Sequence, residues 1–349
     1  MEYRKTISQL VASHPLEIKT DVCIEGRIPT SVSSEFITNK EQGDWAERIV
    51  FDAINKETSD YIAVRYGKND SLSAGDEGFR EFYSNYLNEL NTIGKRPDIL
   101  IFKRSDYHTG CHLTDELVSK ALCALEVRSS SFLIEKYNKF MATRHKEALR
   151  VINDNVSLIF GSNLKKVLQK KSPAIYGYLS NITEETLSNL KFKTPSWSTS
   201  DELKRLSLLL KEIKKEINVI QKRDYLSITP KLEDIALVNR WIQKYNVPHY
   251  YLQVFFDRGF IISFEDILRI SSDCDKEGHD FSVESDVKNQ GKTTIKINVN
   301  CTDLILKKID MPLHRSEMKE LDRGRLLFYV KFVGGQGYLD KTVFDEIVK

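Results

Sequence analysis

The sequence lacks the long apolar runs and the cysteine pairs that would indicate a membrane or secreted protein. No apolar segment approaches the roughly 18 residues needed to cross a bilayer. The first residues lead into no long apolar stretch, so we expect no secretory signal. The five cysteines are scattered and never occur as CxxC, which argues against a zinc site or a disulfide framework. These absences favour a protein of a reducing cytoplasm.

The sequence also has little excess charge of either sign. It contains 52 basic and 50 acidic side chains, a formal net charge of +2. A wholly basic surface is therefore excluded. A nuclease is not excluded, because its basic groove and its acidic metal ligands can cancel in the sum. Composition alone does not indicate the function.

Repeats, low-complexity tracts and Gly/Ser-rich linkers are also missing from the sequence. A chain of 349 residues is long enough for one core with a large insertion or for two domains. Apolar periodicity predicts helices over 42–56, 79–93, about 132–151, 200–223 and 233–244. Short apolar runs predict strands over 98–102 and 121–127, a β-hairpin over 250–264, and strands at 294–299 and 325–332 before a Gly-rich turn at 334–337.

The helix predicted over 200–223 has the most regular apolar stripe in the chain. Its apolar residues are spaced three or four positions apart, which places them on one face of a helix. They are Leu203, Leu206, Leu210, Ile213, Ile217 and Ile220. Leaving it in water would forfeit several kcal/mol, so it packs within the chain or against a second subunit, and we expect the former. The basic residues between are interleaved with glutamates, which favours a solvated face over a DNA-binding one.

Two predicted strands carry a carboxylate at one end. Asp98 opens the first strand, and Glu126 lies at the end of the second, two residues before Arg128. Because residues two apart lie on one face of a strand, Glu126 and Arg128 can both point toward the side that Asp98 faces. Carboxylates on adjacent strands beside a cation suit Mg²⁺-assisted phosphodiester hydrolysis, since hard oxygen ligands hold the metal and the metal activates a water.

With this arrangement the sequence resembles the PD-(D/E)XK nuclease superfamily, and within it the type II restriction endonucleases. The motif is Arg96-Pro97-Asp98, then 27 residues, then Glu126-Val127-Arg128. Glu47, on the predicted helix 42–56, matches a carboxylate that the family often places before the first core strand. The segments EVRSSSFL and PHYYLQVFFD, the second of which contains Gln253, are similar to AccI-type enzymes. The resemblance covers residues 40–150 and 228–270.

This resemblance implies a restriction-endonuclease-like α/β core, in which a central mixed β-sheet is flanked by helices, with a helical insertion and a C-terminal α+β extension. The implied parts are an N-terminal segment at 1–40, the nuclease core at 41–150 and 241–270, the insertion at 151–240 and the extension at 271–349. DNA recognition or dimer contacts are expected in the extension.

The implied activity is that of a Mg²⁺-dependent, site-specific endonuclease that cuts double-stranded DNA and leaves 5′-phosphate ends. Asp98 and Glu126 are then the metal ligands, and Glu47 and Arg128 complete the catalytic set. We expect a homodimer, because cutting both strands of a palindrome needs two sites related by a twofold axis. A bacterial cytoplasm is the expected location, with no membrane partner.

Arg128 departs from the family pattern, which usually has lysine at this position. Arginine stays protonated, so it cannot act as a general base, but it can stabilise negative charge. We favour Arg128 as the catalytic cation. The alternative is that Lys136 or Lys139 on the following helix has that role, while Arg128 only pairs with Glu126.

Other interpretations of these residues stay open. Asp98 can be a strand cap and Glu126 a simple salt-bridge partner, in which case the chain is a DNA-binding protein that kept the fold and lost the chemistry. A third possibility is a nuclease of DNA repair or of mobile-element processing. His249, between proline and tyrosine, is expected to be a core or edge histidine and not a catalyst.

Overall fold

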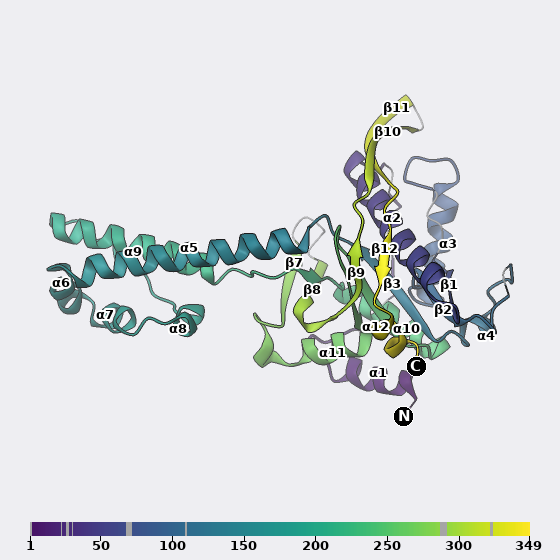
Figure 1. Cartoon of the computed structure of the whole chain (residues 1–349), viewed down its shortest axis with the longest axis horizontal. Coiled ribbons are helices and arrows are strands. Elements are labelled where there is room, and N and C mark those ends of the chain that lie inside the picture. The colour runs from purple at the N-terminus through teal and green to yellow at the C-terminus, as the bar shows by residue number, and fades with distance from the viewer. Residues whose placement is uncertain are drawn as a thin grey trace. The chain divides into compact units, whose positions relative to one another are not determined.

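The computed structural model describes all residues except 1, 22, 26–27, 30, 68–71, 109, 287–291 and 322–323. Its contacts divide the chain into two compact units, which are described separately below (Figure 1). The core unit comprises Met1–Ile134 and Leu226–Lys349, and the helical unit comprises Glu135–Tyr225.

A seven-stranded mixed β-sheet forms the centre of the core unit, with the strand order β1-β2-β3-β5-β6-β9-β12 (Figure 1). Among its described strand pairs, β3 and β5 are parallel and the others are antiparallel. The expected α/β class, with a central mixed sheet flanked by helices, is confirmed. The strands are β1 (Tyr61–Arg65), β2 (Ile99–Lys103), β3 (Cys123–Ser129), β5 (His249–Val254), β6 (Gly259–Ser263), β9 (Asp303–Ile309) and β12 (Gly337–Leu339).

The helix α2 (Ser34–Glu57) packs on one face of this sheet. Ser33 caps its first turn, because the Ser33 hydroxyl accepts a hydrogen bond from the Phe36 backbone N–H. Its buried residues face alternate residues of β2, β3 and β5. The helix contributes Trp45, Ala46, Ile49, Val50, Ala53 and Ile54, and the strands contribute Ile99, Ile101, Leu125, Val127, Leu252 and Val254. This apolar cluster is the main core beneath α2.

The remaining residues of the same strands face the opposite side, because successive side chains of a strand alternate. There the ring of His249 contacts Trp241 of α10 (Leu232–Tyr245) and Phe264 of α11 (Phe264–Ser272). α1 (Tyr3–Ala12) packs against α10 and α11. Glu126 and Arg128 of β3 also belong to this side of the sheet, since Leu125 and Val127 face α2.

The C-terminal residues contribute more to the sheet than the sequence led us to expect. Residues 271–349 were expected to lie outside the core, yet β9, β12 and α12 (Lys341–Ile347) complete its sheet and its apolar cluster. Gly337 allows this packing, because a Cβ there would lie 2.8 Å from Ile49 of α2. Strands this short show too few alternating residues for a sequence pattern to assign them to a particular sheet.

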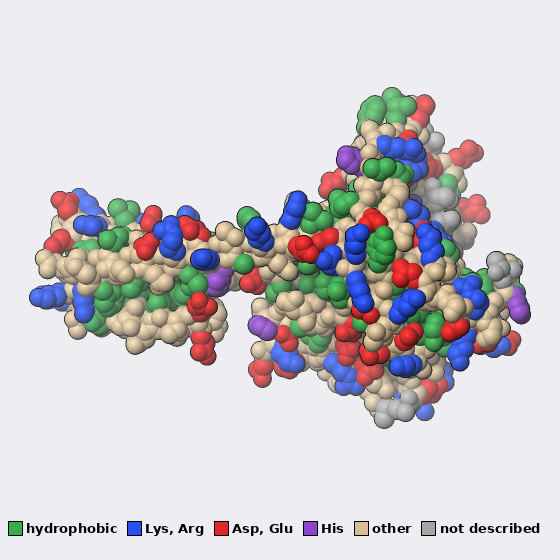
Figure 2. Space-filling model, in the orientation of Figure 1, with side chains coloured by type: hydrophobic (Ala, Val, Ile, Leu, Met, Phe, Trp, Pro, Cys, Tyr) green, Lys and Arg blue, Asp and Glu red, His purple; other side chains and the backbone are tan. Residues whose placement is uncertain are grey.

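Other elements of the core unit lie outside the seven-stranded sheet. β10 and β11 form a hairpin whose apolar residues Met318, Leu326 and Phe328 are exposed by 54%, 47% and 62%. Hydrophobic side chains gather at the upper end of this hairpin in Figure 2. β4, β8 and β7 form a small sheet of their own. The bounds are α3 (Phe79–Thr92), α4 (Asp115–Val118), β4 (Ser227–Ile228), β7 (Phe281–Asp286), β8 (Lys292–Asn298), β10 (Leu313–Leu321) and β11 (Arg325–Val333).

The helical unit consists of α5 (Ile134–Phe160), α6 (Leu164–Lys171), α7 (Pro173–Ser180), α8 (Glu184–Asn189) and α9 (Asp201–Ile220). It begins and ends earlier than the expected range 151–240. The reasons are that α5 runs unbroken to Phe160 and that α10 packs in the core unit. Among the described residues, no helix has the combination of length and apolar character that a membrane span requires.

The apolar stripe of α9 is buried within the helical unit, as expected. Leu206, Leu210, Ile213 and Ile217 pack against residues of α5, α6, α7 and α8. The visible surface of this unit shows lysine and arginine side chains interspersed with aspartate and glutamate (Figure 2). This mixture agrees with a solvated polar face on α9.

Charged substitutions in this stripe should therefore unfold the helical unit. We expect Leu210→Asp or Ile217→Asp to cost more than about 3 kcal/mol, because each places a carboxylate in a filled apolar core. Leu208→Asp is the matched control, since Leu208 lies on the same helix but is 63% exposed. Urea denaturation measures the effect. A variant that stays folded but changes its mass in light scattering would instead assign the stripe to a subunit interface.

Candidate active site

The pairing of β2 with β3 brings Asp98 and Glu126 together. Ile99 lies opposite Leu125 in the antiparallel register, so Asp98, directly before β2, lies opposite Glu126. The Asp98 N–H donates to the Leu125 carbonyl at 3.0 Å, and the Val127 N–H donates to Asp98 Oδ2 at 2.7 Å. Backbone hydrogen bonds therefore hold the Asp98 carboxylate beside Glu126.

Glu126 lies in a cluster of four charged side chains. Its Oε1 atom is 2.8 Å from Lys95 Nζ and 2.6 Å from Arg128 Nη2. The same two cations contact Asp234 Oδ2 of α10, at 2.7 Å from Lys95 and 3.3 Å from Arg128. Two carboxylates thus share two cations on the α10 side of the sheet.

The two carboxyl groups of the central pair differ in their pKa shifts. Burial alone would raise the pKa of Glu126, but Lys95 and Arg128 outweigh it and hold that pKa below its usual value. The pKa of Asp98 is raised well above its usual value by burial and by the negative charges of Glu126 and Glu47. Negative charge around Asp98 is therefore incompletely compensated within the protein.

The residues fit a divalent cation in their chemistry. Glu126 Oε2 is buried and has no hydrogen-bond partner among the described residues. Such an atom is costly to bury unless it has a ligand or a water. In the described part of the chain no three His, Cys, Asp or Glu side chains are grouped to enclose a metal. Two carboxylates suit Mg²⁺, because they leave most coordination positions of the ion free and Mg²⁺ keeps several waters and contacts substrate phosphates.

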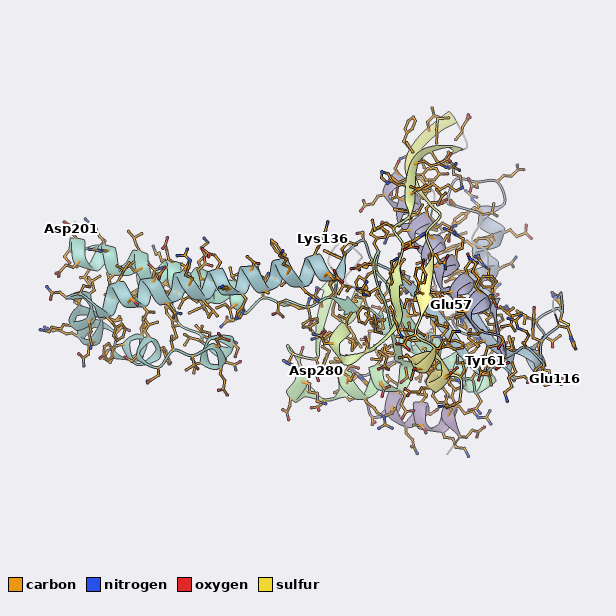
Figure 3. The ribbon with its side chains drawn as sticks, in the orientation of Figure 1. Glu57, Tyr61, Glu116, Lys136, Asp201 and Asp280 are labelled. Carbon is orange, nitrogen blue, oxygen red and sulfur yellow. The ribbon has the colours of Figure 1, made fainter. Side chains whose placement is uncertain are left out.

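The other residues expected at this site lie in different parts of the fold. Glu47 is on α2, and its charge reaches Asp98, as the pKa shift of Asp98 shows. Arg128 contacts Glu126 and keeps 35% of its side chain exposed. Lys136 and Lys139 lie in the first turns of α5, within the helical unit, and Figure 3 labels Lys136. Asp98, Glu126, Arg128, Lys95 and Asp234 all belong to the core unit.

Lys95 and Asp234 complete the charged cluster, although the sequence did not identify either residue. Lys95 lies three residues before Asp98, so a lysine next to the motif was a visible signal. Asp234 is 136 positions after Asp98 and lies in the first turn of a helix, where acidic residues are common for local reasons. Its contact with Lys95 depends on tertiary packing and leaves no local pattern.

Strand β5 lines the site with a row of buried polar side chains. In its parallel register with β3, His249, Tyr251 and Gln253 lie beside Ala124, Glu126 and Arg128. His249 is fully buried, as expected for a core histidine, but neither ring nitrogen has a partner among the described residues. The Tyr251 hydroxyl and Gln253 Oε1 are also buried without a partner there.

The buried histidine should make the protein acid-sensitive. Burial lowers the pKa of His249 from 6.5 to about 4, with Lys95 and Arg128 acting in the same direction and Glu126 opposing them. Because the folded pKa lies below the unfolded one, this contribution to stability is present above pH 6.5. It is lost as pH falls toward 4, since the unfolded chain binds a proton that the folded chain does not.

Urea denaturation at pH 7 and pH 4.5 should show this loss. We expect the free energy of unfolding of the wild type to fall by about 2 to 3 kcal/mol more than that of His249→Phe. His112→Phe, at an exposed histidine, is the control and should behave as the wild type does. Equal losses in the wild type and in His249→Phe would contradict the prediction.

Comparison with known proteins gives one finding. The family model described as AccI restriction endonuclease matches residues 1–349, the whole chain. No curated protein and no solved structure gives a significant match.

Proposed function

Because this chain belongs to the AccI restriction endonuclease family, we propose for it a Mg²⁺-dependent mechanism centred on Asp98 and Glu126. The family makes the chain a type II site-specific deoxyribonuclease of a restriction–modification system, and DNA is its substrate. The metal, its ligands and the form of the products are our proposal. One observation carries it: Asp98 lies opposite Glu126, whose buried Oε2 atom has no protein partner among the described residues.

Each charged residue has a defined task in this mechanism. Asp98 and Glu126 would hold Mg²⁺, which, when bound, would activate a water and offset negative charge on the phosphate. The Val127 N–H fixes the orientation of the Asp98 carboxylate. Lys95 and Arg128 keep Glu126 ionised in spite of its burial. The partly exposed Arg128 also stabilises the charge that develops on the scissile phosphate.

Glu47 belongs to the catalytic set through α2. Its negative charge is one of the causes, after burial and Glu126, that raise the pKa of Asp98. Glu47 follows Trp45 and Ala46, which are buried in the core cluster, so the helix backbone at this position is firmly held. We propose that Glu47 is a third carboxylate that would help to hold the metal.

The wider features of the enzyme follow from the family and the sheet. We propose that the seven-stranded sheet is a PD-(D/E)XK core, and that the enzyme is a homodimer that cuts double-stranded DNA and leaves 5′-phosphate ends. Two identical sites are the simplest way to cut both strands of a symmetric sequence. For the part of residues 271–349 that lies outside the seven-stranded sheet we propose DNA recognition or dimer contacts, and the exposed apolar residues of the β10–β11 hairpin support this role.

Removing either metal ligand should abolish cleavage. We expect Asp98→Asn and Glu126→Gln to slow cleavage of plasmid DNA by about 100-fold or more, because each removes a charged oxygen ligand. Chelation of divalent ions should stop the wild type as well. Folding, followed by circular dichroism, and DNA affinity in Ca²⁺ should change little. Asp106→Asn, exposed beyond the end of β2, is the control. Near wild-type cutting by either ligand variant would refute the assignment.

Substitutions of the cation decide between Arg128 and the lysines of α5. We expect Arg128→Ala to lose two or more orders of magnitude in rate, about the effect of removing a donor to a developing oxyanion. Arg128→Lys should keep part of the activity, because it keeps the charge but not the planar donor geometry. Single-turnover rates of Lys136→Ala and Lys139→Ala complete the comparison. If Lys136→Ala or Lys139→Ala is inactive while Arg128→Ala still cuts DNA, that lysine and not Arg128 is the catalytic cation.

A further inference from the structure

The backbone of Lys95 is fixed against α10. The Lys95 N–H donates to the Leu237 carbonyl at 3.1 Å. Gly94, just before it, has φ of +91°, and a Cβ there would lie 2.2 Å from the same carbonyl oxygen. Only glycine lets the chain approach the helix this closely. The position of Lys95 is therefore determined by a specific packing contact.

The side chain of Lys95 is held by the same helix. Asp234 lies almost one turn before Leu237 on α10, and its Oδ2 atom is 2.7 Å from Lys95 Nζ. Asp234 Oδ2 also accepts a hydrogen bond from Arg128 Nη2 at 3.3 Å. One helix thus holds the backbone of Lys95, its ammonium group and the neighbouring guanidinium.

The ammonium group has a donor left for a further ligand. It carries three N–H bonds, and the described structure provides acceptors for two of them, Glu126 Oε1 and Asp234 Oδ2. The Lys95 side chain as a whole is 17% exposed. An anion placed over Glu126 would be within its reach.

A purely structural role explains this cluster poorly. Burying ion pairs costs several kcal/mol per ion, and stability alone seldom repays that cost. Buried charged clusters of this kind are concentrated at functional sites. Here the cluster contains Glu126 and lies beside Asp98, the two carboxylates proposed as metal ligands.

We propose that Lys95 is a second catalytic cation, which donates a hydrogen bond to a non-bridging oxygen of the scissile phosphate, and that Asp234 is a positioning residue for Lys95 and Arg128. The proposal rests on the proposed metal site at Asp98 and Glu126. Lys95 keeps its proton throughout. Water adds its oxygen to phosphorus and gives up one proton to solvent. The bond from phosphorus to the 3′ oxygen breaks, and that oxygen takes a proton from solvent to leave as the 3′ hydroxyl. Lys95 stabilises the charge on the phosphate during that exchange.

The test uses the full-length enzyme and two measurements. The first is the single-turnover rate of DNA cleavage in Mg²⁺, with DNA affinity measured separately in Ca²⁺. The second is Mn²⁺ binding without DNA, followed by calorimetry. Lys95→Met removes the charge at similar length, and Lys95→Arg retains it. Lys103→Met, at the exposed far end of β2, is the control.

We expect Lys95→Met to lower the cleavage rate by about 100-fold, the effect of losing one donor to a developing oxyanion. Its DNA affinity should stay within about threefold and its Mn²⁺ affinity should be kept or increased, because a nearby positive charge is lost. Lys95→Arg should recover at least part of the rate. Cleavage by Lys95→Met within about threefold of the wild type would overturn the proposal.

Asp234→Asn should lower the rate by about tenfold, as is typical when a group that orients a catalytic residue is removed. In the double variant with Lys95→Met, this second loss should be smaller, because part of the effect of Asp234 acts through Lys95. A fully additive loss would show that Asp234 does not position Lys95. The double variant also removes one charge of each sign, so it serves as the test of Lys95 if Lys95→Met alone fails to fold.

Mn²⁺ binding separates this proposal from the proposed function. If Asp98→Asn binds Mn²⁺ as tightly as the wild type does, the assignment of Asp98 as a metal ligand is refuted, and the proposed role of Lys95 is refuted with it. If Asp98→Asn loses the metal but Lys95→Met cuts normally, the metal site stands and only the role of Lys95 is refuted.

Discussion

The buried carboxylate of Glu126 is the constraint on which the arrangement around it depends. An ionised group in the middle of a sheet is strongly disfavoured unless cations and hydrogen bonds compensate for the lost water. Lys95 and Arg128 provide that compensation, and Asp234 keeps both cations in place. α10 must then lie close to β3, and Gly94 is the residue that permits the chain to approach it.

The sequence predicted those parts of the site that depend on local pattern. Asp98, Glu126 and Arg128 follow from strand alternation, and the hairpin at β5 and β6 follows from its turn and its strand-forming residues. Lys95 was visible beside the motif, but its partner Asp234 is supplied by a distant helix and has no sequence signal. The sequence did not assign β9 and β12 to the central sheet, because the pattern of so short a strand does not indicate which strands pair with it or which sheet it joins. The long α5 was predicted only in part, since a periodic pattern does not fix where a helix ends.

The two units differ in what they contribute. The helical unit has an apolar core of its own, formed by α9 and the four helices around it. None of Glu47, Asp98, Glu126 and Arg128 belongs to it. The core unit carries these residues on a sheet whose two faces are used differently, with apolar packing under α2 and charged and polar side chains toward α10. A rigid apolar support on one face is what allows donors and acceptors on the other to be held at fixed distances.

The order in which the chain is made has a consequence for the cell that makes it. Glu47, Asp98, Glu126 and Arg128 are all synthesised before the helical unit, whereas Asp234 and strand β5 follow it. A nascent chain that ends within the helical unit therefore has both carboxylates of the proposed metal site. It lacks the parallel neighbour of β3 and the acceptor that holds Lys95 and Arg128. The ribosome has to pass residue 254 before the charged cluster and its supporting strand can form. A truncated product of translation that ends earlier therefore carries the proposed catalytic groups without Asp234 and β5, the partners that hold them in place.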